Sequence, residues 1–233
     1  MYGYYWRFDP TYLLIIIGML LSLAASAKLK STFAVYRSRR SASGLTGAEA
    51  ARRILNAAGI TDVQIVPVSG SLTDHYDPRS KTVRLSEDIY GQTSLAAVGV
   101  AAHECGHAIQ HHIDYAPLSI RSALVPVANF GSTLSWPLFF AGLIFSIQPL
   151  LTLGIVLFSF AVLFQLVTLP VELNASSRAL HMLESTGILS RDENSGARKV
   201  LRAAALTYVA ALASSILQLL RLIILAGGRR SDD

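Results

Sequence analysis

Charged residues are scarce in this chain of 233 residues. Asp, Glu, Lys and Arg make up 15% of it and hydrophobic residues 52%, whereas a soluble domain usually has about 25% charged residues. This composition is typical of a membrane protein with one modest polar domain. The net charge of +5 does not indicate nucleic-acid binding, because the basic residues cluster beside apolar segments, a pattern that sets membrane topology.

Cysteine is nearly absent. The only one, Cys105, excludes a disulfide bond within the chain and fits a reducing compartment. Internal repeats, Pro-rich tracts and low-complexity segments are missing too. The sequence therefore has to be interpreted from its apolar segments and from its few polar motifs.

Charge disappears from segments long enough to cross a bilayer, which takes about 20 residues. The first segment covers residues 10–27. The second, 122–171, is too long for one span and predicts two spans joined near residues 146–149. The last, 203–228, contains only Arg221, and its polar residues would also suit a helix lying in the membrane interface. The sequence thus predicts three to four transmembrane helices.

Basic residues predict how these spans are oriented. Most of the Lys and Arg lie in 28–121 and 172–202, and the positive-inside rule places both segments in the cytoplasm. Residues 25–27, Ala-Ser-Ala, resemble a signal-peptidase site, but the positive cluster follows the apolar segment instead of preceding it. We therefore predict an uncleaved anchor and a multi-pass membrane protein, in contact with the lipid bilayer.

The stretch VAAHECGHAIQHH, residues 100–112, contains the motif H-E-x-x-H. On a helix this spacing places His103 and His107 on one face, one turn apart, so that both can bind a single zinc ion. Glu104 lies about 100° around the helix from His103, where it can act as the general base. The small apolar residues before the motif, following Thr93-Ser94, predict a buried helix with its start at that pair.

A catalytic zinc usually has three protein ligands, so the motif leaves one missing. A metzincin would have a third histidine at position 113, which is Ile113 here. His111 lies two turns from His103, roughly 12 Å along the axis, which is too far for one ion. Cys105 faces away from the metal and suits packing on the back of the helix.

The segment LPVELNASSRALHMLES, beginning at residue 169, offers three candidates for the third ligand: Glu172, His181 and Glu184. Pro170 predicts the start of a new helix here. Glu172 is the first charge after the long uncharged segment, an unusual cost unless it is paired or bound to metal. The alternatives for Glu172 are an acid favoured by the start of a helix, or an ion pair with Arg121 or Arg178.

The polar segment before the zinc helix predicts a small α+β domain. Thr46 and Glu49 form a capping-box pattern that starts a helix ending near residue 59. Residues 63–68 alternate as a strand, and turn residues 77–80 separate 74–76 from a strand at 82–85, which predicts a hairpin. Its free edge would bind an extended peptide, with His75 and Tyr76 as possible substrate contacts, although a hairpin that only covers the helix is equally compatible.

Three sequence stretches, HECGH, DHYDPRSKTVRLS and LPVELNAS, together with the spans between them, resemble the bacterial membrane-bound neutral zinc metallopeptidase family over roughly residues 30–225. The order of elements is also similar to that of the CAAX-protease and heat-shock membrane peptidases of gluzincin type. The resemblance implies that Glu172 is the third ligand and that the membrane is the bacterial inner (plasma) membrane. The chain departs from the family patterns at Asn174 and Ser176, where Asp is expected, so the partner that orients a zinc-bound histidine is left open.

We therefore expect a mainly α membrane protein with a small cytoplasmic α+β zincin-like domain. The expected function is a zinc-dependent endopeptidase that holds one Zn²⁺, with protein or peptide substrates that are membrane-associated or unfolded. Transition-state contacts could come from Arg178, His181 or Tyr208. The alternatives are an intramembrane protease, and a metal-dependent membrane scaffold or chaperone without proteolysis. The expected segments are an anchor at 1–30, a catalytic domain at 31–121, a transmembrane hairpin at 122–171, a third-ligand helix and cytoplasmic segment at 172–202 and a C-terminal helix and tail at 203–233.

Overall fold

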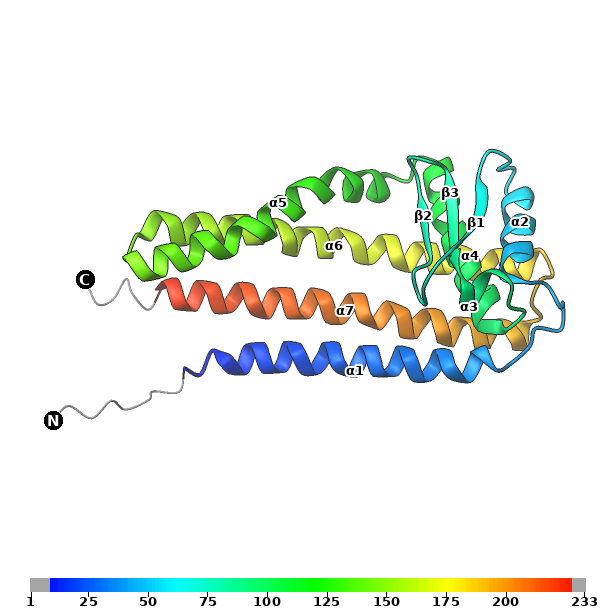
Figure 1. The fold of residues 1–233 in the computed structure, drawn as a ribbon, viewed down its shortest axis with the longest axis horizontal. Helices are drawn as coiled ribbons and strands as arrows, with labels where there is room; N and C mark the ends of the chain where they lie inside the picture. The colour runs from blue at the N-terminus through cyan, green and yellow to red at the C-terminus, as the bar shows by residue number, and fades with distance from the viewer. Residues whose placement is uncertain (1–8, 228–233) are drawn as a thin grey trace. The chain divides into compact units, whose positions relative to one another are not determined.

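The computed structural model describes residues 9–227, so the beginning of the predicted anchor and the end of the predicted C-terminal tail lie outside the described residues (Figure 1). Within this range the chain is mainly α-helical with one small sheet, as predicted. Its elements are α1 (Tyr12–Arg37), α2 (Gly47–Ala57), β1 (Gln64–Val68), β2 (His75–Asp77), β3 (Thr82–Ser86), α3 (Glu87–Tyr90), α4 (Leu95–His112), α5 (Ala116–Phe145), α6 (Gln148–Ser185) and α7 (Arg191–Gly227).

The chain divides into two compact units. The helical unit comprises Met1–Ala24, Leu124–Leu166 and Val209–Asp233, and the mixed unit comprises Ala25–Ala123 and Val167–Tyr208. The four long helices α1, α5, α6 and α7 each contribute residues to both units.

The long helices α1, α5, α6 and α7 are each long and apolar enough to cross a membrane. Many of their large apolar side chains are exposed, as expected of side chains that face lipid. In the helical unit, small residues let helices approach closely, as is common in membranes. The Ser214 hydroxyl donates to the Gly18 carbonyl oxygen at 2.9 Å and lies 3.1 Å from the Ser22 hydroxyl. The chain is thus a mainly α, membrane-type protein with four candidate spans.

The sequence correctly predicts the turn between α5 and α6, but the prediction that a new helix begins at Pro170 is wrong. Helix α6 runs without interruption from Gln148 to Ser185 and contains Pro170. Proline removes one backbone N–H, a loss that neighbouring groups can offset in a long membrane helix. Glu172 therefore lies inside a helix, which excludes the alternative that its charge is favoured by a helix start.

The mixed unit contains the predicted capping box. The Thr46 side chain accepts from the Glu49 backbone N–H, and the Glu49 side chain accepts from the Thr46 backbone N–H. The predicted hairpin is present as the antiparallel pair β2–β3. Strand β1 pairs in parallel with β3, a pairing that the sequence analysis did not predict, and the sheet order is β1-β3-β2. Within residues 9–227, strand β2 therefore pairs with another strand on one side only.

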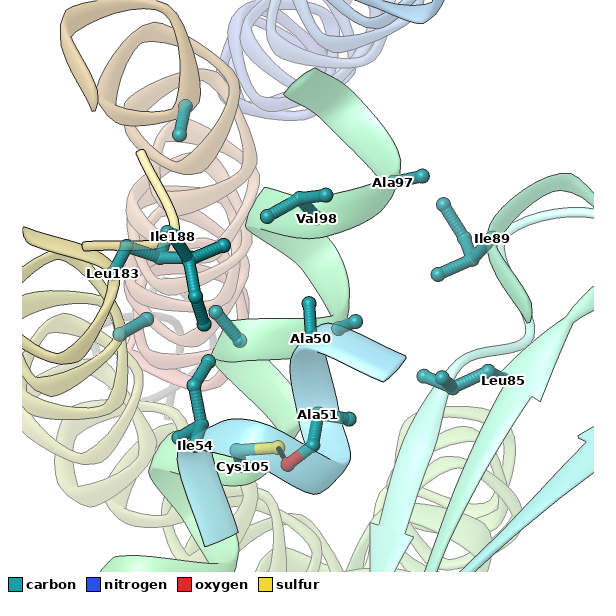
Figure 2. Close-up of a cluster of buried hydrophobic side chains, with 14 of the residues drawn as sticks. Ala50, Ala51, Ile54, Leu85, Ile89, Ala97, Val98, Cys105, Leu183 and Ile188 are labelled. Atoms are coloured by element: carbon teal, nitrogen blue, oxygen red, sulfur yellow. Dashed lines mark hydrogen bonds between the residues drawn. The ribbon is translucent and has the colours of Figure 1, made fainter. Parts of the chain in front are cut away.

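The core of the mixed unit forms where α2 packs on the back of α4 (Figure 2). Ala50, Ala51 and Ile54 of α2 are fully buried in this cluster. As the sequence predicts, Cys105 packs on this side of α4, and its thiol donates to the Ala51 carbonyl oxygen at 3.6 Å. This packing holds one face of α4 and leaves the opposite face, with both motif histidines, to meet α6.

Candidate metal centre

Helix α4 positions the two motif histidines. It begins after Ser94, whose hydroxyl accepts from the Ala97 N–H at 3.1 Å, so Ser94 is the cap of the predicted Thr93-Ser94 pair. The rings of His103 and His107 lie one turn apart, with centroids 4.8 Å from each other. The Nε2 atoms of both rings approach the same carboxylate oxygen, that of Glu172 on α6.

Glu172 joins the two histidines into one group of donor atoms. Its Oε2 lies 3.2 Å from Nε2 of His103 and 3.6 Å from Nε2 of His107, and the side chain is nearly fully buried. The other two candidates lie elsewhere on α6. His181 is exposed, and Glu184 contacts Arg191 at 3.2 Å. In the described part of the chain, one group of at least three His, Cys, Asp or Glu side chains could hold a metal ion. This group is the trio of His103, His107 and Glu172.

The dimensions of this trio fit zinc. Ligand atoms about 2.0–2.2 Å from a tetrahedral zinc lie roughly 3.4 Å from one another. The two Nε2–Oε2 distances, 3.2 and 3.6 Å, bracket that value, and all donor atoms lie within 4.8 Å of one another. Two imidazole nitrogens and one carboxylate oxygen are also a donor set that catalytic zinc sites use.

Gly106 allows α4 and α6 to approach each other at this level. A Cβ atom at Gly106 would overlap the Ala175 carbonyl oxygen and would lie 3.0 Å from the carbonyl carbon. Any larger residue at this position would push the helices apart. The glycine of HECGH therefore sets the distance between the motif histidines and Glu172.

The second ring nitrogen of each histidine also has a partner. Nδ1 of His103 lies 3.1 Å from the Ser176 hydroxyl. Nδ1 of His107 lies 3.0 Å from Oε1 of Gln110, a residue that the sequence analysis did not single out. The signal for Gln110 was a polar residue on a buried helix face, one turn after His107. A role for Gln110 can be assigned only from its partners on α6, the Val171 carbonyl oxygen and the Asn174 side chain.

Glu104, Arg121 and Tyr208 lie around the trio. Glu104 is buried next to the trio on α4. The second carboxylate oxygen of Glu172, Oε1, lies 3.7 Å from Nη2 of Arg121, and Nε of Arg121 is buried without a hydrogen-bond partner. Tyr208, the last residue of the mixed unit, interacts electrostatically with Glu172. Arg121 is thus an additional cation at the site, as one of the sequence alternatives for Glu172 anticipated.

The charges of the site act on His107. Burial lowers the pKa of this imidazole, but the hydrogen bond with Glu172 and the charges of Glu104 and Glu172 outweigh burial, so the net shift is upward. A metal ion binds the neutral ring. Zinc would therefore compete with a proton for His107.

The remaining predicted contacts lie outside the trio. His75 is exposed on β2, with Nδ1 2.8 Å from the Thr73 carbonyl oxygen. The Tyr76 hydroxyl lies 2.8 Å from Nδ1 of His111, which gives His111 a partner other than the metal group. Nε of Arg178 donates to Oδ1 of Asn174 at 2.7 Å. Of the three residues expected as transition-state contacts, Tyr208 is the one that lies beside Glu172.

Comparison with known proteins gives a family and a relative. Residues 11–227 match a family model described as "Putative neutral zinc metallopeptidase". The chain is 50% identical over 220 residues to a protein of Bacillus subtilis (strain 168) named "Putative membrane protease YugP", with 94% of this chain and 98% of the relative aligned. No solved structure gives a significant match.

Proposed function

The chain belongs to the neutral zinc metallopeptidase family, and from that premise we propose that it is a membrane-anchored zinc endopeptidase. The observation that carries the proposal is the trio of His103, His107 and Glu172, of which His107 and Glu172 are buried, with the buried Glu104 next to His103 on α4. Its proposed substrates are membrane-associated or unfolded proteins. The four candidate spans and the relative's description as a membrane protease support a membrane location.

His103, His107 and Glu172 would hold one zinc ion through two nitrogens and one oxygen. When bound, zinc would polarise the scissile carbonyl and lower the pKa of water from 15.7 to about 7. Glu104 accepts a proton from the attacking water and later delivers it to the leaving amine. The burial of Glu104 on α4 and its charge acting on His107 support this role.

Arg121 and Tyr208 are suited to stabilise negative charge that develops on the substrate. Arg121 has a buried N–H without a partner in the structure, and Tyr208 carries a hydroxyl next to Glu172. Donors fixed before the reaction stabilise an oxyanion more than water does. Of the three residues expected from the sequence, Tyr208 is therefore favoured over His181 and Arg178 for this role, and Arg121 is a further candidate.

A peptide substrate could bind along β2. This strand is an edge of the sheet, because among the described residues β3 is the one strand that pairs with it. Strand addition would pair the backbone of an extended peptide with the free edge of His75–Asp77. The competing interpretation is that the hairpin only covers α4.

The protease and the scaffold interpretations make different predictions for Glu104→Gln. The substitution keeps the size of the side chain but removes its basicity, so we expect normal zinc content and a fall in peptide hydrolysis of at least ~10². Purified full-length protein in detergent, measured for both metal and turnover, provides the test. A zinc-loaded variant that hydrolyses peptides at the original rate would contradict the role of Glu104. If instead the original protein binds membrane clients without cleaving them, and the variant does the same, the chain is a scaffold.

The intramembrane-protease alternative requires the motif helix to cross the membrane. Among the helices that the structure describes, α4 is not one of the four candidate spans. It ends in a polar stretch, His111 and His112, and packs against α2 in the mixed unit. These observations favour an active site at the membrane surface, which we propose to be the cytoplasmic surface because of the basic residues in 28–121 and 172–202.

A further inference from the structure

We propose that Arg178, Asn174 and Gln110 form a relay that fixes His107 in the tautomer able to bind zinc. The proposal rests on the proposed zinc site and concerns residues that would touch neither metal nor substrate. They are positioning residues. The direction of each hydrogen bond between them follows from which atoms can only donate and which can only accept.

A neutral histidine carries its proton on either Nδ1 or Nε2, and a metal binds the nitrogen that lacks it. In His107, Nε2 faces Glu172 and Nδ1 faces Gln110. Binding through Nε2 therefore requires the proton to be on Nδ1. A side-chain amide next to Nδ1 can favour either tautomer, because it presents an acceptor oxygen in one orientation and a donor NH₂ in the other.

The orientation of the Gln110 amide is determined by its own neighbours. The end of Gln110 that points away from His107 lies 2.8 Å from the Val171 carbonyl oxygen, a group that can only accept. It also lies 3.0 Å from the side chain of Asn174. The contact with Val171 alone requires the NH₂ group at this end, which leaves the amide oxygen of Gln110 facing Nδ1 of His107.

Arg178 fixes the second neighbour. A guanidinium group has donors only, so the Asn174 atom that lies 2.7 Å from Nε of Arg178 must be the oxygen. The same oxygen receives the second proton of the Gln110 amide. Arg178 and Gln110 therefore both donate to the Asn174 oxygen. Nδ1–H of His107 in turn donates to the Gln110 oxygen.

The burial of Gln110 makes the loss of any of these hydrogen bonds costly. Gln110 is fully buried, so water cannot replace a partner that is lost. Turning its amide over would place NH₂ against the imidazole and bring its oxygen against two acceptors, leaving several buried polar groups unsatisfied. The relay also joins α4 to the turn of α6 that carries Glu172, so the ring orientation and the position of the third ligand are coupled.

His103 provides an internal contrast. The partner of its Nδ1 is the Ser176 hydroxyl, 3.1 Å away, and a hydroxyl can rotate to donate or accept. Ser176 thus supports either tautomer of His103. The fixed tautomer is a property of His107, and it depends on the amide and on the two acceptors that hold the amide.

The experiment compares variants of the full-length protein in detergent. Gln110→Met removes the acceptor while keeping an unbranched side chain of similar length. We expect zinc affinity, measured by competition with a chelator, to fall by about 10–100-fold. Asn174→Asp keeps an acceptor for both Arg178 and Gln110 and is expected to bind zinc within about 3-fold of the original affinity, whereas Asn174→Leu, of similar shape, is expected to weaken it.

A second measurement separates positioning from general loss of structure. In metal-free protein labelled with ¹⁵N-histidine, the ring shifts report which nitrogen carries the proton, and the His107 signal is identified by its loss in His107→Gln. We expect a proton held on Nδ1 in the original protein and in Asn174→Asp. In folded Gln110→Met we expect that Nδ1–H signal to be lost, with the ring proton on Nε2, which faces the Glu172 carboxylate when no metal is bound. An unchanged His107 tautomer together with unchanged zinc affinity in Gln110→Met would overturn the relay.

The two proposals can fail independently. If the original protein binds zinc with the expected dependence on Gln110 but hydrolyses no peptide, the relay stands and the endopeptidase proposal fails. If the protein hydrolyses peptides and Gln110→Met neither changes the tautomer nor weakens zinc binding, the endopeptidase proposal stands and the relay fails.

Discussion

Glu172 uses its two carboxylate oxygens for different neighbours. Oε2 faces the two Nε2 atoms of His103 and His107, while Oε1 faces Arg121 at 3.7 Å. An ion pair and a metal ligand are therefore compatible roles for one side chain. From the sequence alone the two roles are alternatives, because a sequence pattern does not assign the two carboxylate oxygens to separate neighbours.

Removing Glu172 tests its role directly. We expect Glu172→Ala to lose tightly held zinc, because two histidines leave the ion short of the three protein ligands that catalytic zinc usually has. Metal analysis of the purified, folded variant gives the result. Glu184→Ala and His181→Ala are controls on the same helix and should retain stoichiometric zinc. The opposite pattern would transfer the ligand role to one of those residues.

Replacing Ser176 with an acidic residue is expected to raise the affinity for zinc. A carboxylate makes a stronger, charge-assisted hydrogen bond to an imidazole N–H than a hydroxyl does, and it raises the basicity of the ring. We expect Ser176→Asp to bind zinc about 10-fold more tightly in a chelator competition. Ser177→Asp adds the same charge at the next, exposed position and serves as the matched control. Equal effects of the two substitutions would show a general influence of charge and no specific contact with His103.

At the scale of elements, the site depends on how closely α4 and α6 approach. Gly106 faces the Ala175 backbone with no room for a Cβ atom, and the Gln110 amide reaches the Val171 carbonyl oxygen of α6. On its other side, α4 packs on α2 through small buried residues and Cys105 (Figure 2). Helix α4 is thus packed on two sides, and small residues determine its distance from α6 and its distance from α2.

Gly106→Ala is expected to force α4 and α6 apart. Overpacking of this kind costs about 1–3 kcal/mol of the free energy of unfolding, and the same displacement would separate Glu172 from the histidines. Thermal unfolding and zinc affinity should therefore both decrease. Gly91→Ala is the matched control, because a Cβ atom there would meet nothing within 4 Å. A Gly106→Ala protein with unchanged stability and zinc affinity would show that the close approach is not required.

At the scale of the whole molecule, the four candidate spans and the distribution of basic residues predict a membrane topology. Residues 28–121 and 172–202 carry most of the Lys and Arg. The α5–α6 turn, at Ser146 and Ile147, has none nearby. We propose that the two basic segments face the cytoplasm and that this turn faces the opposite side.

Cysteine labelling in intact cells tests the topology. Single cysteines replacing Ser38 and Ser190, which are exposed in basic segments, should resist a membrane-impermeant reagent, whereas Gln148→Cys next to the α5–α6 turn should react. The native Cys105 is a silent background, because it is buried and burial raises the pKa of its thiol far above neutral. Labelling of positions 38 and 190 from outside, with position 148 protected, would reverse the assignment.

The sequence by itself determined the features that depend on local pattern. Long uncharged segments predicted the apolar helices. The spacing in HECGH placed His103 and His107 on one helix face, and the capping residues predicted where α2 and α4 begin. The turn residues between β2 and β3 likewise predicted the hairpin. These features follow from helix periodicity, hydrophobicity and turn geometry, which act over a few residues.

The tertiary structure decided what depends on contacts between distant segments. The parallel pairing of β1 with β3, the continuation of α6 through Pro170, and the approach of Glu172 to the histidines all need neighbours far away in the sequence. Gln110 shows the reason most clearly. A buried glutamine has no assigned role until its acceptors are known, and those acceptors, Val171 and Asn174, are more than 60 residues away along the chain.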